Sequence, residues 1–573
     1  METLDQRLAR KLEKKRRLIR VAAGQEEADL VIRNARFLNV FTSRWEQGDI
    51  AVAGGIIAGI CGKYLAAQDI DAAGRYLIPG LIDAHIHLES AIVMPAEFAR
   101  IALRHGTTTV ICDPHEIANV MGTDGIRFML QATEEIGVDV MFMLPSCVPA
   151  TTLDEAGASL SYRDIDMFYS HPRVLGLAEM MNYTGVLNGD REVLEKILAA
   201  QSHHKKIDGH APALSGADLD AYIAAGVYSD HECSDLQNAM DKLRRGQFIM
   251  IREGTAAHNL DALLPLIQPE LYSRCMFATD DKHPNDLLRG GHIDAILRRC
   301  FSAGTDPILA LKTATHNAAR YFLMNNKGAI AGGYVADLVL LDDLPSFRIA
   351  RVIKRGKTVF ESGKDIRMDP PHIDSDLQKA ARNSVHLSPL RTDSLAAGRA
   401  PVIRLIPGQI VTEDGGYAER PDPEHDILLC AVFERHRHTG HIGIGYLQGY
   451  GLRKGAVATS ISHDSHNIIA VGVSASDILH AVHAVAENGG GIFVTDGQNT
   501  KGLPLPIAGL MSDAPMEQVN ACLEAVKDFA FSLGVSRGID PFMTLSFLAL
   551  PVIPKLKLTT HGVFDVEKWA FRT

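Results

Sequence analysis

The segment PGLIDAHIHLES, residues 79–90, combines an apolar strand with two histidines at its end. In a strand, residues two apart point to the same face and lie roughly 6–7 Å apart along the chain. His85 and His87 can therefore reach one metal ion together, since imidazole is a common metal ligand. Taken alone, the pair is equally well explained by two polar residues near a strand end, so its meaning depends on the surrounding sequence.

Seven further apolar runs follow this one, separated by segments with helical character. In chain order the eight runs are LIDAHIH, TTTVICDPHE, VMFMLPS, VLGLAEM, KKIDGHAP, VYSDHE, FIMIREG and CMFATDD. Strands that alternate with helices predict parallel βαβ units. Eight such units favour an α/β fold of the closed (β/α)8 TIM-like barrel type. An open, doubly wound sheet is the alternative.

Each run ends in polar residues that are capable of chemistry. Barrel enzymes place their active sites at the C-terminal ends of the strands, whereas a purely structural explanation does not predict polar residues at all eight ends. The joint pattern therefore indicates an active site more strongly than any member of it does. The residues are His85 and His87, Asp113 and His115, Ser146, Glu179, His210, His231, Arg252 with Glu253, and Asp280 with Asp281.

The strand-end residues include a plausible set of metal ligands. His210 and His231 bring the number of imidazoles to four, a donor type that suits zinc, iron, manganese or cobalt. Glu179 lies in an apolar setting, where an unpaired charge is costly, and it could bridge two metals. Asp280 could ligate a metal and accept a proton from its bound water, although a helix cap is the alternative. This set predicts metal-assisted hydrolysis.

The barrel region is flanked by segments of different character. A basic amphipathic arm, residues 1–27, is expected to be a solvated helix packed on the body, with a membrane or partner helix as the alternative. The barrel itself is expected over residues 77–327. The segments on either side of it, residues 28–76 and 328–370, are rich in short strands, which predicts one β-sandwich built from both. Residues 371–401 are typical of a loosely packed linker. Residues 402–573 mix strands and helices, which predicts an additional α+β domain.

Composition excludes several function classes. The chain has 573 residues, of which 46% are hydrophobic and 22% charged, and its net charge is −11. A bulk attraction for nucleic acid or anionic membranes is therefore not expected. No apolar run is long enough to cross a bilayer, and the eight cysteines form no CxxC pair. A cytoplasmic enzyme with reduced thiols is expected, and its size favours a homo-oligomer.

Many long motifs in this chain resemble adenine deaminases of the amidohydrolase superfamily. The similarity extends from about Asp29 almost to the C-terminus, and only the basic arm lies outside it. The motifs occur in the family's order, which makes the resemblance specific. They include PGLIDAHIHLES, DPHEIANVMG, PSCVPAT, GLAEMMNYTGV, DGHAP, DHE, IMIREGTAAHNL, FATDDKHPNDLL, GAIAGGYVADLVLLDDL, HIGIGYLQGYGLRKGAVATSISHDSHNIIAVG and LALPVIPKLKLTTHGVFDV.

The resemblance implies a barrel with a composite β-sandwich and an extra C-terminal domain. It implies hydrolysis of adenine to hypoxanthine and ammonia at a pair of divalent metals, manganese or iron, with zinc as a further possibility. In that family a hydroxide bridging the metals attacks C6 of adenine. Carried over to this chain, His85 and His87 bind the more buried metal and Glu179 bridges. His210 and His231 bind the second metal. Asp280 is a further metal ligand and also transfers protons.

The acid that protonates N1 of adenine stays open among Glu116, Glu232 and Glu89, each of which follows a strand-end motif. Asp113 and His115 are expected to shape the pocket or to assist proton transfer, with a structural role as the alternative. Further expected substrate-binding residues are Ser146, Arg252 and Glu253.

A second polar cluster, His463, Asp464 and His466, lies outside the barrel. By spacing it could bind another metal, but a loop packed near the barrel mouth is the favoured interpretation. His436 and His438 are expected to be surface histidines.

Two other functions remain open from the sequence. One is a different amidohydrolase acting on a cyclic amide or another purine-like base, and the other is a non-catalytic binding protein on a decayed barrel. A zinc deaminase of the cytidine type is excluded because the chain contains no PCxxC motif.

Overall fold

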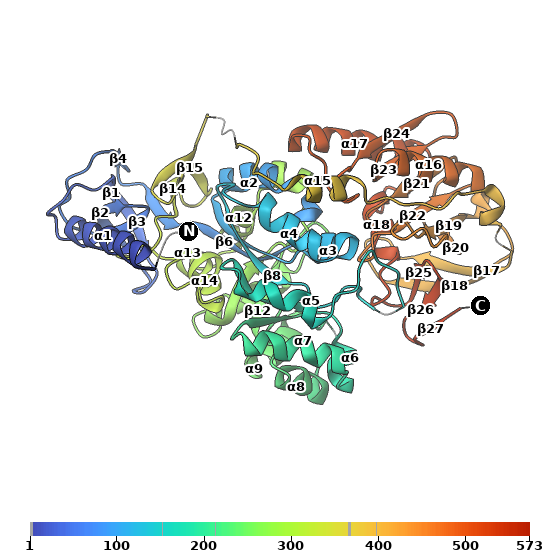
Figure 1. The fold of residues 1–573 in the computed structure, drawn as a ribbon, viewed down its shortest axis with the longest axis horizontal. Coiled ribbons are helices and arrows are strands. Elements are labelled where there is room, and N and C mark those ends of the chain that lie inside the picture. Colours follow the sequence, from blue (N-terminus) through green and yellow to red (C-terminus); the bar gives the residue numbers. More distant parts are fainter. Residues whose placement is uncertain (1–3, 152, 213, 365–367, 397, 573) are drawn as a thin grey trace.

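The computed structural model describes residues 4–151, 153–212, 214–364, 368–396 and 398–572. Three parts lie in a row along its long axis (Figure 1): a small sheet with the N-terminal helix, a central barrel, and a C-terminal domain. Residues 1–3 of the predicted basic arm lie outside the described chain, and the rest of that arm forms helix α1 (Leu4–Ala22). Val21 of α1 is buried against apolar residues of the small sheet, so the helix packs on that sheet.

The barrel consists of eight parallel strands, one at each predicted run. The first five form one sheet in the order β10-β9-β8-β7-β6, and the last three form another in the order β11-β12-β13. The cylinder is closed by a parallel bridge between Ile86 and Asp280 and by a hydrogen bond from Tyr228 N to Ile207 O at 3.2 Å. The closed barrel is therefore confirmed over an open sheet. The strands are β6 (Leu81–Ile86), β7 (Thr107–Cys112), β8 (Asp139–Leu144), β9 (Val174–Met180), β10 (Lys206–Gly209), β11 (Ser229–Asp230), β12 (Phe248–Arg252) and β13 (Cys275–Ala278).

Helices follow the strands and cover the barrel. The buried faces of these helices pack on the outer faces of the strands and form one large apolar core with them. A second apolar cluster, which includes Ile82, Met143 and Met276, lies on the inner face of the strands. The helices are α2 (Pro95–Arg104), α3 (His115–Met121), α4 (Thr123–Ala132), α5 (Tyr162–Asp166), α6 (Tyr183–Asn188), α7 (Arg191–Ser202), α8 (Gly216–Ala224), α9 (Leu236–Arg244), α10 (Leu260–Leu263), α11 (Pro284–Arg289), α12 (Ile293–Ser302), α13 (Pro307–Lys312) and α14 (Ala318–Tyr321).

The small sheet is built from both sides of the barrel segment, and its strands pair into one hydrogen-bonded sheet where a β-sandwich was predicted. Its order is β16-β15-β14-β5-β1-β2-β3, and β4 pairs with β1. The two parts meet where β14 pairs antiparallel with β5, with Leu338 opposite Pro79. Residues 77–79 therefore belong to this sheet and not to the barrel, because β5 continues past residue 76. The strands are β1 (Leu30–Asn39), β2 (Arg44–Ala53), β3 (Ile56–Ile60), β4 (Asp69–Asp71), β5 (Tyr76–Pro79), β14 (Leu338–Asp343), β15 (Arg348–Lys354) and β16 (Lys357–Glu361).

The C-terminal domain holds an eight-stranded sheet in the order β18-β17-β20-β19-β22-β21-β23-β24, a three-stranded sheet β25-β26-β27, and three helices. The elements are β17 (Ala400–Leu405), β18 (Thr412–Ala418), β19 (Ile427–Phe433), β20 (Ile442–Gln448), β21 (Ala456–Thr459), β22 (Ile468–Gly472), α16 (Ala475–Glu487), β23 (Gly491–Thr495), β24 (Thr500–Pro504), α17 (Met516–Ser532), α18 (Pro541–Leu548), β25 (Leu556–Thr559), β26 (Gly562–Asp565) and β27 (Ala570–Phe571).

The connection before this domain is packed and not loose. It contains helix α15 (Ser375–Arg382), which lies between the barrel and the C-terminal domain (Figure 1). Ala381 is buried, and its carbonyl accepts a hydrogen bond from Ala508 N at 2.7 Å. The Pro and Ser content predicted a linker, but the amphipathic helix within it buries its apolar face between the two larger domains.

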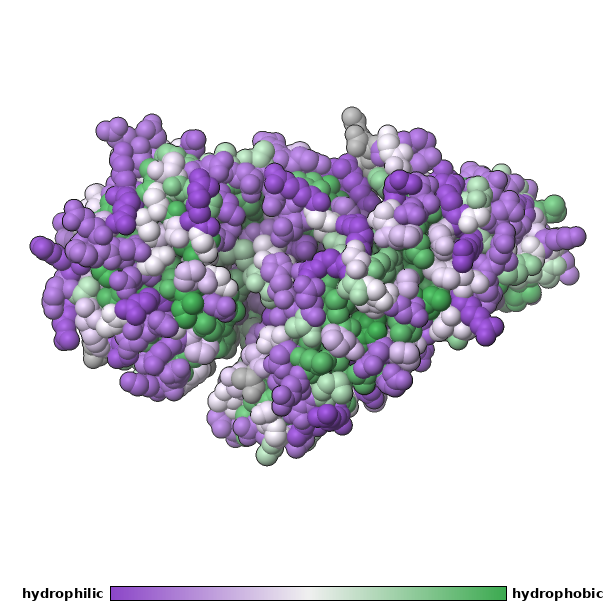
Figure 2. All heavy atoms as spheres, turned by 180° about the vertical axis from the view of Figure 1, so that it is seen from behind, coloured by the Kyte–Doolittle hydropathy of each residue, from purple (hydrophilic) through white to green (hydrophobic). Residues whose placement is uncertain are grey.

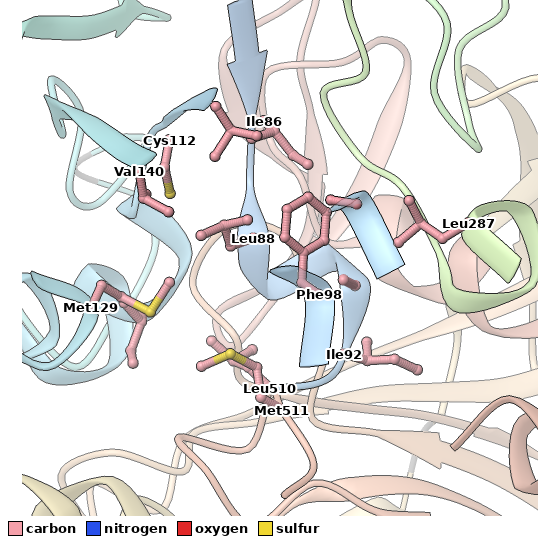
Figure 3. Packing of buried hydrophobic residues seen from close by; sticks show 14 of the residues in the cluster. Ile86, Leu88, Ile92, Phe98, Cys112, Met129, Val140, Leu287, Leu510 and Met511 are labelled. Atoms are coloured by element: carbon pink, nitrogen blue, oxygen red, sulfur yellow. The ribbon is translucent and has the colours of Figure 1, made fainter. Parts of the chain in front are cut away.

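Apolar packing is continuous across the barrel and the C-terminal domain. Figure 3 shows Phe98 of α2 near Leu88 and Leu287, in a cluster that also takes in Leu510 and Met511 of the C-terminal domain. Hydrophilic residues cover most of the face shown in Figure 2, and apolar residues gather there in separate patches. Across the described residues, helices with both the length and the apolar character of a membrane span are absent.

We expect Phe98→Ala to lower the free energy of unfolding by about 3–5 kcal/mol, because it leaves a cavity in this shared core. Phe41→Ala is the matched control, since Phe41 is 54% exposed. Urea titrations followed by circular dichroism measure both variants. Equal unfolding midpoints would contradict the placement of Phe98.

Candidate functional site

The six predicted metal ligands meet at one mouth of the barrel. Each lies at or just after the C-terminal end of its strand, and parallel strands in a barrel bring those ends together. All except His210 are buried, and the side chain of His210 is 21% exposed. The strands and their residues are β6 with His85 and His87, β9 with Glu179, β10 with His210, β11 with His231, and β13 with Asp280.

The carboxylate of Glu179 is shared between two pairs of histidines. Its Oε1 lies 3.5 Å from Nε2 of His85 and 3.2 Å from Nε2 of His87. Its Oε2 lies 3.2 Å from Nε2 of His231 and 2.8 Å from Nδ1 of His210. One carboxylate that faces two separate imidazole pairs has the arrangement of a bridging ligand.

Asp280 completes the first of these two groups. Its Oδ1 lies 3.5 Å from Nε2 of His85 and 3.1 Å from Nε2 of His87. On its other side Oδ2 accepts a hydrogen bond from Arg252 at 2.7 Å. Asp280 therefore lies between the two histidines and the guanidinium group of Arg252.

The chemistry of this donor set fits two divalent metal ions. Nε2 of His85 is buried and has no hydrogen-bond partner, as expected for a ligand atom that faces a metal. Nδ1 of His87 lies 3.0 Å from the carbonyl oxygen of Asp113, so that nitrogen donates and Nε2 keeps its lone pair for a metal. His85, His87, Asp280 and Glu179 could hold one ion, and His210 and His231 could hold the other with Glu179.

The electrostatic surroundings keep the two carboxylates ionised. Burial raises the pKa of Glu179, but the neighbouring histidines outweigh burial and hold this pKa well below its usual value. Burial likewise raises the pKa of Asp280, and its contacts with His85, His87 and Arg252 lower it well below normal. Both groups are therefore anions that can ligate metal.

The remaining strand-end residues are engaged in contacts of their own. Arg252 also binds both carboxylate oxygens of Glu232, with 3.0 Å between Nη2 and Oε2. The hydroxyl of Ser146 donates to the carbonyl oxygen of Glu179. Glu253 is held by His258 at 2.8 Å and by Arg299. None of the four predicted substrate-binding residues, Asp113, Ser146, Arg252 and Glu253, lines the cavity described next.

A cavity of about 240 Å³ lies between the barrel and the C-terminal domain, and its wall includes Asp281, the chain neighbour of Asp280, but none of the six ligands themselves. Barrel residues on its wall include Glu89, Glu116 and Asp281, and the C-terminal domain contributes His463 and Phe547 among others. The His463 ring stacks on Phe547 with 4.8 Å between centroids and 26° between planes. The wall therefore offers a flat aromatic surface next to carboxylates.

The ISHDSH loop, residues 461–466 between β21 and β22, enters this mouth from the C-terminal domain. Nδ1 of His463 lies 2.9 Å from Oε1 of Glu116, and Nε2 of His466 contacts Oε2 of the same carboxylate. Oδ1 of Asp464 lies 4.0 Å from Nε2 of His115. The loop thus packs at the barrel mouth, against the motif that carries Asp113 and His115, whose side chains lie 2.8 Å apart.

The three candidate acids differ in their partners. Burial raises the pKa of Glu116, but His463, His466 and His115 outweigh it and hold this pKa well below normal. Glu232 has a lowered pKa because Arg252 and two histidines outweigh its burial. Burial raises the pKa of Glu89 to about 7. Its Oε1 accepts a hydrogen bond from Ile117 N at 3.2 Å, and its buried Oε2 has no partner.

Sequence reasoning missed the cavity residues of α17 and α18, among them Lys527, Phe542 and Phe547. No motif marks them, because they are ordinary helix residues that tertiary packing brings to the site. The ISHDSH loop did carry a signal, its density of polar residues, but its partner Glu116 is 350 residues away from His466.

Comparison with known proteins agrees with this architecture. Residues 76–359 match the amidohydrolase family, and residues 408–570 match the adenine deaminase C-terminal domain. The adenine deaminase of Desulfatibacillum aliphaticivorans is 48% identical over 97% of this chain and 98% of its own length. Adenine deaminase 2 of Carboxydothermus hydrogenoformans is also 48% identical, over 96% of this chain and 98% of its own length. At this identity over almost its whole length, the chain belongs to the adenine deaminase family within the amidohydrolases.

Proposed function

We propose that this protein hydrolyses adenine to hypoxanthine and ammonia at a pair of divalent metals held by the barrel mouth. The observation that carries the proposal is the Glu179 carboxylate shared between two histidine pairs. The relatives named above are adenine deaminases over the same length of chain. The cavity between the barrel and the C-terminal domain offers an aromatic wall and carboxylates, which suits a planar base with several ring nitrogens.

Manganese or iron would occupy this centre, with zinc as a further possibility, because imidazole and carboxylate together suit first-row divalent ions. Such ions supply a water molecule that is acidic enough to attack carbon near neutral pH. The four histidines would hold the ions, and Glu179, which faces both histidine pairs, would be shared between them. Arg252 and Asp113 orient the ligands from behind through their contacts with Asp280 and His87.

Asp280 is the residue that moves the proton of the attacking water. It is ionised, it lies beside both histidines of the first group, and its Oδ2 is anchored by Arg252. As C6 of adenine is attacked, Oδ1 takes up this proton and passes it to the amino nitrogen, which then leaves as ammonia. The anchor keeps the carboxylate in place during both transfers.

Glu89 is the group placed to meet N1 of adenine. Glu116 and Glu232 are each bound to cationic or imidazole partners. Glu89 lines the cavity, and its buried Oε2 has no protein partner. The His463 ring on Phe547 forms a wall on which the purine can stack, so the C-terminal domain contributes to substrate binding.

An ammonia-release assay on adenine with metal-loaded protein tests the activity directly. We expect ammonia and hypoxanthine in equal amounts. Opening of hydantoin-like rings without ammonia release from adenine would instead assign the chain to another amidohydrolase activity.

The variant Glu179→Gln is expected to lower bound divalent metal below two ions per chain, because an amide cannot neutralise two cations. Elemental analysis of the purified protein measures this. Glu192→Gln, an exposed carboxylate on α7, is the control and should keep the parental metal content. Full metal content in Glu179→Gln would argue against the bridge.

The variant Asp280→Asn is expected to lower kcat for ammonia release by about 10²–10⁴-fold, the usual contribution of a general acid–base group. Metal content is measured in the same samples, so that loss of metal is separated from loss of proton transfer. Asp261→Asn serves as the control because that carboxylate is 78% exposed. Parental kcat in Asp280→Asn would refute the assignment.

Two further variants separate the candidate acids. Glu89→Gln should lower kcat about 10²-fold with metal content unchanged. Glu116→Gln should mainly raise KM, because it releases the His463 wall from the barrel. Steady-state kinetics on adenine distinguish these patterns, and the reverse result would assign the acid to Glu116.

A further inference from the structure

A second group of potential metal ligands lies on the seam between the barrel and the C-terminal domain and shares no residue with the six ligands of the barrel mouth. Glu155 comes from the loop after β8, His441 immediately precedes β20, and His561 occupies the turn between β25 and β26. We propose that these three residues form a zinc site that fastens the barrel loop to the C-terminal domain.

The three side chains lie close to one another. Nδ1 of His441 lies 2.8 Å from Oε1 of Glu155, and Nε2 of His561 lies 4.0 Å from Oε2. One ligand atom from each residue falls within 4.8 Å of the others. Bonds of about 2.0–2.2 Å from zinc to nitrogen and oxygen place tetrahedral ligands roughly 3–4 Å apart. Small rotations of these side chains therefore suffice to enclose an ion.

An unsatisfied atom points to a missing partner at this place. Oε2 of Glu155 is buried and has no hydrogen-bond partner, although its side chain is 23% exposed as a whole. Such an oxygen is costly unless it is paired. The side chains of His441 and His561 are 52% and 41% exposed, so an ion can enter and water can fill its fourth position.

Two imidazoles, one carboxylate and one water match a ligand set that zinc accepts. The three residues come from separate segments of two domains, and an ion held by all of them would cross-link those segments. Asn467, which follows the ISHDSH loop directly, donates to the carbonyl oxygen of Glu155 at 2.6 Å. Zinc at this seam would thus hold the barrel loop against the segment that brings His463 and His466 to Glu116.

Zinc titration of the manganese-loaded enzyme, followed by dialysis and elemental analysis, tests the site. We expect His561→Ala and Glu155→Gln each to bind one zinc fewer per chain than the parent. His203→Ala is the matched control, since His203 also contacts a carboxylate, Asp166, at 2.9 Å. This control should bind as much zinc as the parent. Zinc that enters the barrel mouth contributes equally to every sample and cancels in the difference.

Thermal unfolding gives a second measurement. Zinc at a saturating concentration should raise the Tm of the parent and of His203→Ala by more than that of His561→Ala, because binding to the folded state stabilises it by mass action. Without zinc the variants should show parental ammonia release, since none of these residues faces the cavity. Equal zinc content in the parent, His561→Ala and Glu155→Gln would overturn the proposal, and so would equal shifts in Tm.

Discussion

A buried carboxylate divided between two pairs of imidazoles is the constraint on which the barrel mouth depends. Charges taken out of water are tolerated only when partners surround them, and Glu179 is surrounded on both oxygens. Its carbonyl is held by Ser146, His87 is held by Asp113, and Asp280 is held by Arg252. The neighbouring loops are therefore arranged around one anion, and the proposed two-metal chemistry rests on that arrangement.

The sequence predicted the parts of the site that depend on strand order. Parallel strands place their ends at one mouth, so His85, Glu179 and Asp280 were expected to converge although they are far apart in the chain. The α/β barrel with an added C-terminal domain is confirmed. Periodicity could not reveal which polar residues converge on Glu179 and which only support the loops, because Ser146 and Glu253 have the same position at strand ends as the proposed ligands do.

Contacts between domains escaped prediction for a different reason. The pairing of Glu116 with His463 and His466 depends on how the barrel and the C-terminal sheet pack together, and no local pattern encodes that packing. The helix in the expected linker, α15, was hidden by its Pro- and Ser-rich surroundings. Through Ala381, α15 belongs to the apolar core shared by the barrel and the C-terminal domain, in which Leu510 and Met511 pack with barrel residues.

The pairing of β5 with β14 also affects how the chain can fold during its translation. Strands β1 to β5 emerge first, but the edge of β5 that receives β14 stays open until the entire barrel has been translated. An unpaired strand edge invites association with other chains. The nascent protein must therefore keep this edge shielded while the barrel closes, and only the last strands before α15 seal the small sheet.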